Sequence, residues 1–200
     1  MGEVIRAAVT RSERLVDGLL ALAESDRGID RTERVDLAEL VCPALDHLAS
    51  DARKAGIRTA ATRQAALVTG SRVLLERLVQ NLVDNGIRHN RPGGWLAILT
   101  ASQGDMVTLI VESSGPPITA EQAASLFEPF RRLHADRVGS ARGSGLGLSI
   151  VRAVARAHAG EATASPVADG GLRVTVTLPA APPATADARP GKAADRPLLP

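Results

Sequence analysis

Aromatic residues are almost absent from this chain, which has one Trp, two Phe and no Tyr among its 200 residues. The core must therefore be built from Leu, Val, Ile and Ala, and the apolar fraction of 44% is sufficient for that. The formal net charge is only +2, and the basic residues are spread among acidic ones with no aromatic residues between them. These features argue against a nucleic-acid surface.

Cysteine and long apolar runs are scarce as well. The single cysteine, Cys42, cannot form a disulfide framework and is compatible with a reducing compartment. No stretch approaches the roughly 20 apolar residues of a membrane-spanning helix, and the N-terminus carries no signal-peptide pattern. These absences predict a cytoplasmic location with no membrane segment in this chain. The length suits one medium-sized domain with appendages.

The residue pattern divides the chain into three parts. Residues 1–34 are predicted to hold one long helix, at residues 2–25, followed by a polar linker, because apolar residues recur there at spacings of three and four. That apolar stripe needs a partner, and oligomerisation is favoured over packing on its own domain. Residues 35–180 alternate helical and strand patterns. Residues 181–200 are rich in Ala and Pro, which predicts a disordered tail.

Within the central part, local signals place the elements. Helices are predicted at residues 37–55, 72–89, 119–127 and 146–158, and strands at 57–61, 66–69, 95–102, 106–112, 161–165 and 172–178. Asp36 is predicted to cap the first of these helices, and Thr119 with Gln122 forms a capping pattern at the third. Residues 113–117 are predicted to be a turn-rich break. Residues 128–144 are too long for a simple connector, which indicates a functional lid.

Three glycines at alternate positions, Gly143, Gly145 and Gly147, lead directly into the last predicted helix. Glycine lets the backbone come close to a ligand, and a helix N-terminus offers free N–H groups and the positive end of the dipole. That combination suits a phosphate, and a flexible turn that merely starts a helix is an equally open interpretation. The spacing fits neither the dinucleotide fingerprint nor the P-loop, since no Lys follows the glycines.

The helix predicted at residues 72–89 carries two amides at the rim of its apolar face. Asn81 and Asn85 are four residues apart and so lie on one side of the helix, with Arg88 one turn further on. A buried polar group without a partner costs about 1–3 kcal/mol, so both amides need partners. Neighbouring backbone could supply them. The register with Arg88 favours instead a polar cavity that holds Mg²⁺ and phosphates.

Four segments in order carry a resemblance to sensor histidine kinases. Residues 81–90 resemble the N box of that family, 112–118 occupy the place of its first glycine box, 126–130 resemble its F box, and 143–148 resemble its second glycine box. Order and spacing agree over about residues 35–180. The resemblance implies the α+β fold shared with type II topoisomerases, heat-shock chaperones and mismatch-repair ATPases. That fold is a two-layer α/β sandwich with a mixed sheet and helices on one face, here preceded by one long helix.

The resemblance also implies which residues bind ATP and Mg²⁺. Asn85 would be the Mg²⁺ ligand and Asn81 would assist at the metal or its waters, so both are the candidate catalytic residues. Arg88 and His89 would face the phosphates, which the glycines of the second glycine box would wrap. The full implied ATP-binding set is Asn81, Asn85, Arg88, His89, Ser113, Gly115, Phe130, Gly143, Ser144, Gly145, Leu146 and Gly147.

The resemblance further implies that residues 128–144 form the ATP lid. Phe127 and Phe130 would anchor its hinge, and simple core packing is an equally open role for both.

Two features depart from the pattern of the family. The first glycine box usually opens with an Asp that accepts a hydrogen bond from the adenine amine, whereas here Ser113 stands in that place and Pro117 replaces a glycine. A serine hydroxyl still accepts a bond but loses the charge assistance that makes such bonds about twice as strong. The second departure concerns residues 11–24, which resemble the second helix of a dimerisation hairpin. No histidine precedes the ATP domain, so self-phosphorylation at the usual site is not expected.

The main hypothesis is an ATP-dependent protein histidine kinase domain that transfers the γ-phosphoryl group to a histidine on another chain or on a missing N-terminal helix. Its partner would be a histidine-bearing dimerisation domain or a response regulator, and a homodimer is open. The alternative is a degenerate, non-catalytic module that docks on a kinase or regulator. A topoisomerase- or chaperone-type ATPase is disfavoured because Asn81 occupies the place of their general-base Glu, and an anti-sigma serine kinase is disfavoured by residues 11–24.

Overall fold

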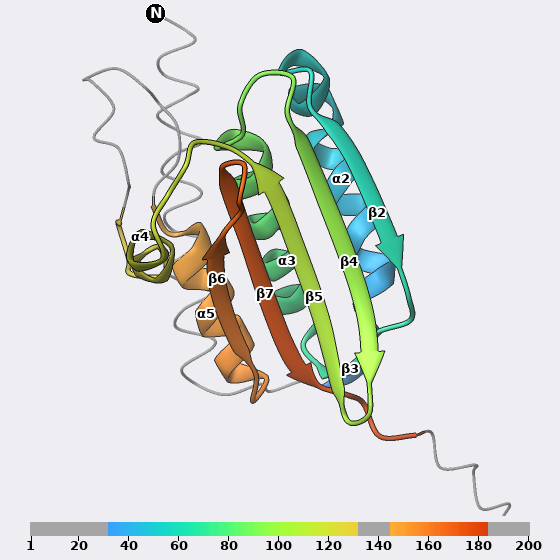
Figure 1. The fold of residues 1–200 in the computed structure, drawn as a ribbon. Coiled ribbons are helices and arrows are strands. Elements are labelled where there is room, and N and C mark those ends of the chain that lie inside the picture. Colours follow the sequence, from blue (N-terminus) through green and yellow to red (C-terminus); the bar gives the residue numbers. More distant parts are fainter. Residues whose placement is uncertain (1–31, 132–144, 184–200) are drawn as a thin grey trace, which may run out of the picture.

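The computed structural model describes residues 32–131 and 145–183, which form a sheet covered on one side by helices (Figure 1). In chain order the elements are β1 (Glu33–Asp36), α2 (Leu37–Lys54), β2 (Arg58–Arg63), β3 (Leu67–Gly70), α3 (Arg72–Arg88), β4 (Trp95–Gln103), β5 (Met106–Ser114), α4 (Ala120–Ser125), α5 (Gly147–Ala157), β6 (Glu161–Pro166) and β7 (Gly171–Pro179).

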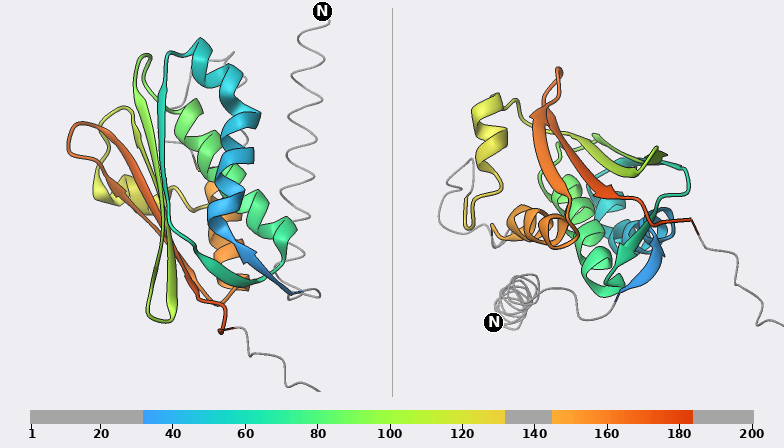
Figure 2. Two further views of the ribbon diagram at one scale, coloured as in Figure 1. Left: turned by 90° about the vertical axis from the view of Figure 1, so that its right-hand side faces the viewer. Right: turned by 90° about the horizontal axis from the view of Figure 1, so that it is seen from below.

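The main sheet has the strand order β2-β4-β5-β7-β6. β2 and β4 are parallel, whereas all other neighbours in this sheet are antiparallel, so the sheet is mixed. Helices α2, α3 and α5 lie against one face of it, as the further views show (Figure 2). The predicted fold class, an α+β two-layer sandwich with helices on one face, is confirmed. The long helix predicted at residues 2–25 lies outside the described residues.

The core fills the space between the two layers and contains almost no aromatic side chains. α3 contributes an apolar stripe that alternates by three and four residues, as expected for a helix packed on a sheet: Leu74, Leu75, Leu78, Val79, Leu82 and Val83, all buried. Alternate residues of β4, β5 and β7 face this stripe, among them Ile98, Leu109 and Val176. Each such side chain contributes about 1.5–3 kcal/mol when fully buried.

The N-terminal ends of the helices agree well with the positions predicted from the sequence. Asp36 accepts a hydrogen bond from the Ala38 N–H at the start of α2, and Ser71 accepts one from the Leu74 N–H at the start of α3. Thr119 and Gln122 form the reciprocal capping box of α4. Each of these caps satisfies a backbone N–H that has no partner inside its helix.

Every predicted strand differs somewhat from its observed limits, by at most one residue at each end for β3, β4, β6 and β7 and by more for β2 and β5, and β1 was not predicted. Residues 33 and 34 belong to β1, which pairs with β3, and not to a linker. β2 begins and ends later than predicted. β5 continues through Ser113 and Ser114, which were expected in a turn, because both pair with β7. At the other end of the domain, Ala180 forms a bridge with Val68 and the Ala181 N–H bonds to Leu67 O, so the small β1–β3 sheet joins both ends of the described domain.

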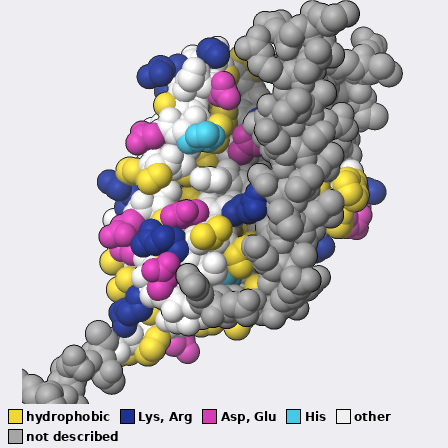
Figure 3. All heavy atoms as spheres, turned by 180° about the vertical axis from the view of Figure 1, so that it is seen from behind, with side chains coloured by type: hydrophobic (Ala, Val, Ile, Leu, Met, Phe, Trp, Pro, Cys, Tyr) yellow, Lys and Arg dark blue, Asp and Glu magenta, His cyan; other side chains and the backbone are white. Residues whose placement is uncertain are grey.

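The surface of the helix-covered side carries charges of both signs. Figure 3 shows Lys and Arg side chains next to Asp and Glu side chains over the part of this face that is not covered by grey atoms. No large field of one sign is visible there, in line with the low net charge. None of the helices in the described residues has the length and apolar character needed to cross a membrane.

Candidate functional site

The C-terminal half of α3 and the N-terminus of α5 lie side by side and bring the predicted amides next to a predicted glycine. The Asn81 amide donates to Arg77 O at 2.8 Å, which fixes the side chain along the helix. A Cβ at Gly147 would lie 3.3 Å from Asn81 Oδ1. The amide oxygen of Asn81 therefore faces the first residue of α5, and the absence of a side chain at Gly147 leaves room for it.

Asn85 lies one turn beyond Asn81 on α3. It is half-buried, and within the described parts of the chain its side chain forms no hydrogen bond. Its backbone carbonyl accepts from the His89 N–H, which closes the end of α3. Asn85 and Asn81 together offer neutral amide oxygens. Such oxygens suit Mg²⁺ when phosphate oxygens and water supply its other ligands. No group of three or more His, Cys, Asp or Glu that could hold a metal occurs among the described residues.

Arg88 and His89 lie at the C-terminal end of α3, and their contact with phosphates stays a prediction. The Arg88 guanidinium pairs with Asp84, four residues earlier on α3, at 2.5 Å. His89 caps the C-terminus of α3 and its backbone carbonyl would lie 3.0 Å from a Cβ on Gly115. Gly115 therefore allows the chain after β5 to pack closely against the end of α3.

Ser113 lies at the end of β5, on the inner face of the sheet. Its side chain is 7% exposed, and no hydrogen bond from its hydroxyl is present in the parts of the chain that the structure describes. A Cβ on Gly86 would be 3.5 Å from Ser113 Cβ and 2.5 Å from Leu96 Cδ1, so only glycine lets α3 approach the strands here. Ser113 is thus a buried hydroxyl that faces α3.

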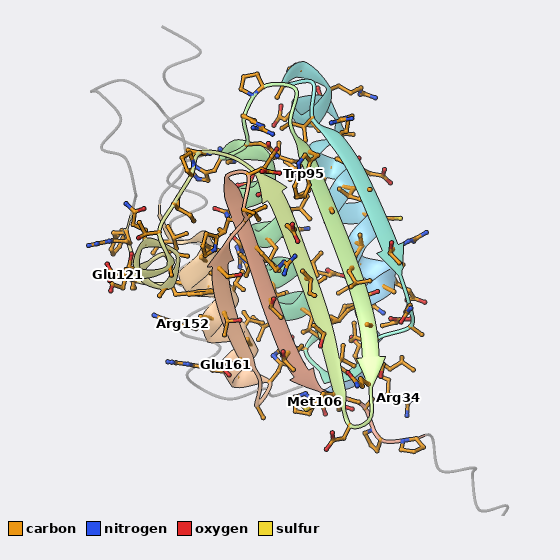
Figure 4. The ribbon with its side chains drawn as sticks, in the orientation of Figure 1. Arg34, Trp95, Met106, Glu121, Arg152 and Glu161 are labelled. Atoms are coloured by element: carbon orange, nitrogen blue, oxygen red, sulfur yellow. The ribbon has the colours of Figure 1, made fainter. Side chains whose placement is uncertain are left out.

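A polar network next to Ser113 was not found from the sequence. The Ser114 hydroxyl donates to Asn90 Oδ1 and accepts from the Trp95 N–H at 2.8 Å. The Asn90 amide in turn donates to Gly86 O and Trp95 O, both at 2.9 Å. This network ties the end of α3 to the adjoining ends of β4 and β5, where Trp95 is labelled in Figure 4. The nearest signal in the sequence is the predicted end of the helix at residue 89, directly before Asn90.

Pro117, which replaces a family glycine, is accommodated without conflict. It is exposed, and the turn between β6 and β7 packs beside it: the Gly171 N–H bonds to Pro116 O at 3.1 Å. A Cβ on Gly170 would approach Gly115 O to 2.7 Å and Pro117 N to 3.3 Å. The close approach at this position is therefore provided by Gly170, which also has a positive φ of 87°.

The two ends of the segment predicted as a lid meet at Phe130 and Gly145. The Phe130 N–H bonds to Gly145 O at 3.0 Å, and both residues have positive φ. A Cβ on Gly145 would lie 3.0 Å from Phe130 Cα, so glycine is needed for this contact. Phe130 is 64% exposed and does not pack in the core. Gly143 and Ser144 lie outside the described residues.

Phe127 is in the core and is held by Arg152 of α5. It is 3% exposed, which agrees with the packing role left open for it. The Arg152 guanidinium donates to Phe127 O at 2.8 Å and lies 5.4 Å from the centre of its ring. Figure 4 shows Arg152 on the side of α5 that α4 occupies. The start of the predicted lid is thus joined directly to the helix that carries Gly147.

The N-terminus of α5 has no side-chain cap. α2, α3 and α4 each begin with a capping side chain, whereas Leu146, which precedes α5, provides none and is itself buried. The first N–H groups of an α-helix have no partner within the helix, and together with the helix dipole they attract anions. Next to them lie Asn81 and Gly145. The arrangement can therefore bind a phosphate.

His158, at the other end of α5, is a buried residue that the sequence did not single out. It is 7% exposed, its Nδ1 donates to Val154 O at 2.8 Å, and its Nε2 accepts from the Ser71 N–H at 3.2 Å. Burial lowers the pKa of this imidazole below its usual value. A Cβ on Gly70 would overlap the ring. His158 therefore joins the C-terminus of α5 to the N-terminus of α3, away from the asparagines.

Comparison with known proteins identifies the domain. Residues 70–182 match the family described as histidine kinase-, DNA gyrase B-, and HSP90-like ATPase. The sensor protein CutS of Streptomyces coelicolor is 47% identical over 180 residues, which cover 90% of this chain and 44% of CutS. The sensor histidine kinase CusS of Escherichia coli is 30% identical over 174 residues, covering 86% of this chain and 36% of CusS. The chain thus spans less than half the length of these relatives.

Among solved structures, the mycobacterial sensor histidine kinase MprB is similar over 74% of this chain and 97% of that one, with 27% identity and a TM-score of 0.65. The family match begins at Gly70 and ends beyond β7. It therefore includes all the elements that carry the site described above.

Proposed function

The chain belongs to the histidine kinase-, DNA gyrase B- and HSP90-like ATPases, and on that premise we propose that it is the Mg·ATP-binding catalytic domain of a two-component sensor histidine kinase. In this role it transfers the γ-phosphoryl group of ATP to a histidine outside the residues of this domain. The observation that supports the proposal most directly is the juxtaposition of Asn81 with Gly147, beside the uncapped start of α5.

The phosphates are proposed to bind at the start of α5. Backbone N–H groups there have no side-chain cap and carry the positive end of the helix dipole. Gly145 and Gly147 let the chain approach the phosphates closely, and we propose that Gly143, Ser144 and Leu146 contribute further backbone contacts. Arg88 is paired with Asp84, so a contact with phosphate would require that pair to open.

Mg²⁺ is proposed to be held by Asn85 with the help of Asn81. Both supply amide oxygens on one side of α3, and Asn85 has no competing hydrogen bond within the described residues. The residues present therefore fit a hard divalent cation that keeps waters and phosphate oxygens as its other ligands. When bound, Mg²⁺ supplies charge neutralisation on the transferring phosphoryl group, and the residues of this chain position that group.

The adenine is proposed to lie near Ser113 and Gly115, at the ends of β5 and α3, with Phe130 at the base of the lid. The acceptor is proposed to be a histidine-bearing dimerisation domain, and the product is a phosphohistidine whose consumer is a response regulator. The proposed reaction needs no general base at position 81, where Asn81 stands, because positioning and charge neutralisation provide most of the catalysis in phosphoryl transfer.

Calorimetric titration of Mg·ATP tests the proposal. The wild-type chain is expected to bind in the micromolar range, and Asn85→Ala is expected to weaken binding at least about tenfold, because it removes the metal ligand. Gln80→Ala is the matched control, since Gln80 is an exposed amide on the same helix and does not lie on the asparagine side. The control should bind as the wild type does.

The alternative is a non-catalytic docking module, for which the missing carboxylate at Ser113 is the specific argument. It predicts no heat and no thermal shift with Mg·ATP, with a fold that is intact by circular dichroism. That result would exclude the kinase proposal. Equal binding by wild type and Asn85→Ala would keep ATP binding but reject Asn85 as the metal ligand.

A further inference from the structure

Ser113 carries a buried hydroxyl that has no hydrogen-bond partner in the parts of the chain that the structure describes. The neighbouring Glu112 points to the opposite face of the sheet, where it pairs with Arg173. Because side chains alternate along a strand, Ser113 faces inward, toward Gly86 of α3. A buried hydroxyl without a partner is unfavourable, so its persistence here indicates a ligand that completes it.

Among the buried serine and threonine hydroxyls of the described residues, only that of Ser113 has no hydrogen bond. Ser114 is even more buried, at 1% exposure, yet its hydroxyl both donates to Asn90 and accepts from the Trp95 N–H. The end of β5 can therefore satisfy a buried serine with its own residues. It satisfies the hydroxyl of Ser114 in this way. The hydroxyl of Ser113, which faces Gly86, is available to another molecule.

The hydrogen-bonding chemistry of a hydroxyl determines which polar group a ligand can place next to Ser113. A serine O–H rotates and serves either as donor or as acceptor, whereas an ionised carboxylate only accepts. The 6-amino group of adenine is a donor, and the 6-oxo group of hypoxanthine is an acceptor. A hydroxyl can pair with either group by turning its hydrogen, and a carboxylate at the same place would repel the 6-oxo group.

We propose that Ser113 makes the nucleotide site tolerant of both 6-amino and 6-oxo purines, so that inosine triphosphate binds with an affinity close to that of ATP. This inference rests on the proposed nucleotide-binding function and on the base lying at Ser113. It concerns the substituent at position 6 of the purine, which is the group that the hydroxyl contacts. The change from adenine to hypoxanthine also turns N1 from an acceptor into an N–H donor, on the same edge of the base.

The experiment compares three triphosphates by calorimetry in the presence of Mg²⁺: ATP, ITP and purine riboside triphosphate, which lacks a 6-substituent. For the wild type, the dissociation constants of ATP and ITP are expected to agree within about fivefold, since one neutral hydrogen bond replaces another. Ser113→Asp is expected to weaken ITP relative to ATP by about tenfold or more, because the carboxylate can only accept. Ser165→Asp is the matched control, as Ser165 is exposed on β6 and should leave all three constants unchanged.

Ser113→Ala keeps the proposal testable if the buried Asp prevents folding. It removes the hydroxyl without adding charge, so ATP and ITP should both weaken by a similar factor of about three to ten. Purine riboside triphosphate should bind to this variant as it does to the wild type.

The outcomes separate the two proposals. If ATP binds to the wild type but ITP is more than about thirtyfold weaker, the tolerance is rejected and the ATP-binding function stands. If Ser113→Ala leaves ATP and ITP unchanged, Ser113 does not contact the base. If none of the three triphosphates binds to the wild type, the nucleotide-binding function itself fails and the inference fails with it.

Discussion

Gly147 shows how a single missing side chain links stability to function. It is the first residue of α5, and a Cβ there would lie 3.3 Å from Asn81 Oδ1, a distance that forces the amide to shift slightly. Within the described residues the Asn81 side chain has a single hydrogen bond, to Arg77 O, so it can shift. The fold therefore tolerates a side chain at this position, but the proposed phosphate site does not.

Gly147→Ala is accordingly expected to leave the thermal midpoint unchanged or raised, since Ala is favoured over Gly in helices by up to about 1 kcal/mol. Mg·ATP affinity should fall several-fold, because the methyl group occupies the space beside Asn81. Differential scanning calorimetry and titration of the same sample measure both quantities. A variant that binds Mg·ATP like the wild type would place the phosphates elsewhere.

His158 is a second residue whose protonation affects the whole fold. Burial lowers its pKa, so the unfolded chain binds a proton at a higher pH than the folded chain. Stability is therefore fully present above the ordinary pKa of histidine and is lost as the pH falls below it. A protonated ring would also turn an N–H toward the Ser71 N–H, which now donates to Nε2.

Chemical denaturation at about pH 5.5 and about pH 7.5 tests this residue. The wild type is expected to be less stable at the lower pH, and His158→Gln should reduce that difference while also lowering stability at the higher pH. His47→Gln is the control, because His47 is exposed on α2. It should keep the wild-type difference between the two conditions, and an equal loss in both variants would contradict the assignment.

At the scale of elements, Arg152 couples α5 to the start of the predicted lid. Its guanidinium donates to Phe127 O and lies over the Phe127 ring. Phe130, inside the predicted lid, and Gly145, directly after it, are joined by a backbone hydrogen bond. The base of the predicted lid and the proposed phosphate site therefore both contact α5. A loss of this contact should affect how long a nucleotide stays bound more than whether the chain folds.

Arg152→Met is expected to lower the free energy of unfolding by about 1–2 kcal/mol, the sum of one hydrogen bond and one cation–π contact. The dissociation rate of a fluorescent ATP analogue, measured by stopped flow, should rise several-fold. Arg156→Met is the matched control, because Arg156 is exposed one turn further along α5. If both variants release the analogue at the wild-type rate, the lid base does not control dissociation.

The elements that could be predicted from the sequence are those specified by neighbouring residues. Helix starts at Asp36, Ser71 and Thr119 and the apolar stripe of α3 depend on spacings of three and four, which are visible in the sequence. β1 was missed because it is four residues long, buries only Val35 fully and is defined by pairing with β3.

The same distinction applies to the candidate site. The asparagines were found because a helix brings residues four apart together, and Asn81 does lie next to Gly147. The ion pair of Arg88 with Asp84 has the same spacing of four residues and could also have been predicted from the sequence. The burial of Ser113 and the network of Ser114 with Asn90 depend on strands and helix ends meeting in space, which no local pattern contains.

At the scale of the whole molecule, the described residues hold three histidines, and all three belong to the ATPase-like domain itself. His89 closes the C-terminal end of α3. His158 is buried between α3 and α5, and His47 lies on the outer face of α2. The chain also spans less than half the length of CutS. Phosphotransfer is therefore expected to depend on a histidine supplied by another domain or chain.

Incubation with γ-labelled Mg·ATP and a separately produced dimerisation hairpin that bears a phosphoacceptor histidine tests this expectation. Label should appear on the hairpin as an acid-labile, base-stable phosphate, because the N–P bond of phosphohistidine hydrolyses in acid. A hairpin with that histidine replaced by Gln should stay unlabelled, and Asn85→Ala in the present chain should reduce labelling at least about tenfold, in parallel with the loss of Mg·ATP binding. Label on the present chain itself, retained when the hairpin is omitted, would show that an acceptor lies within these 200 residues and would overturn transfer to another chain.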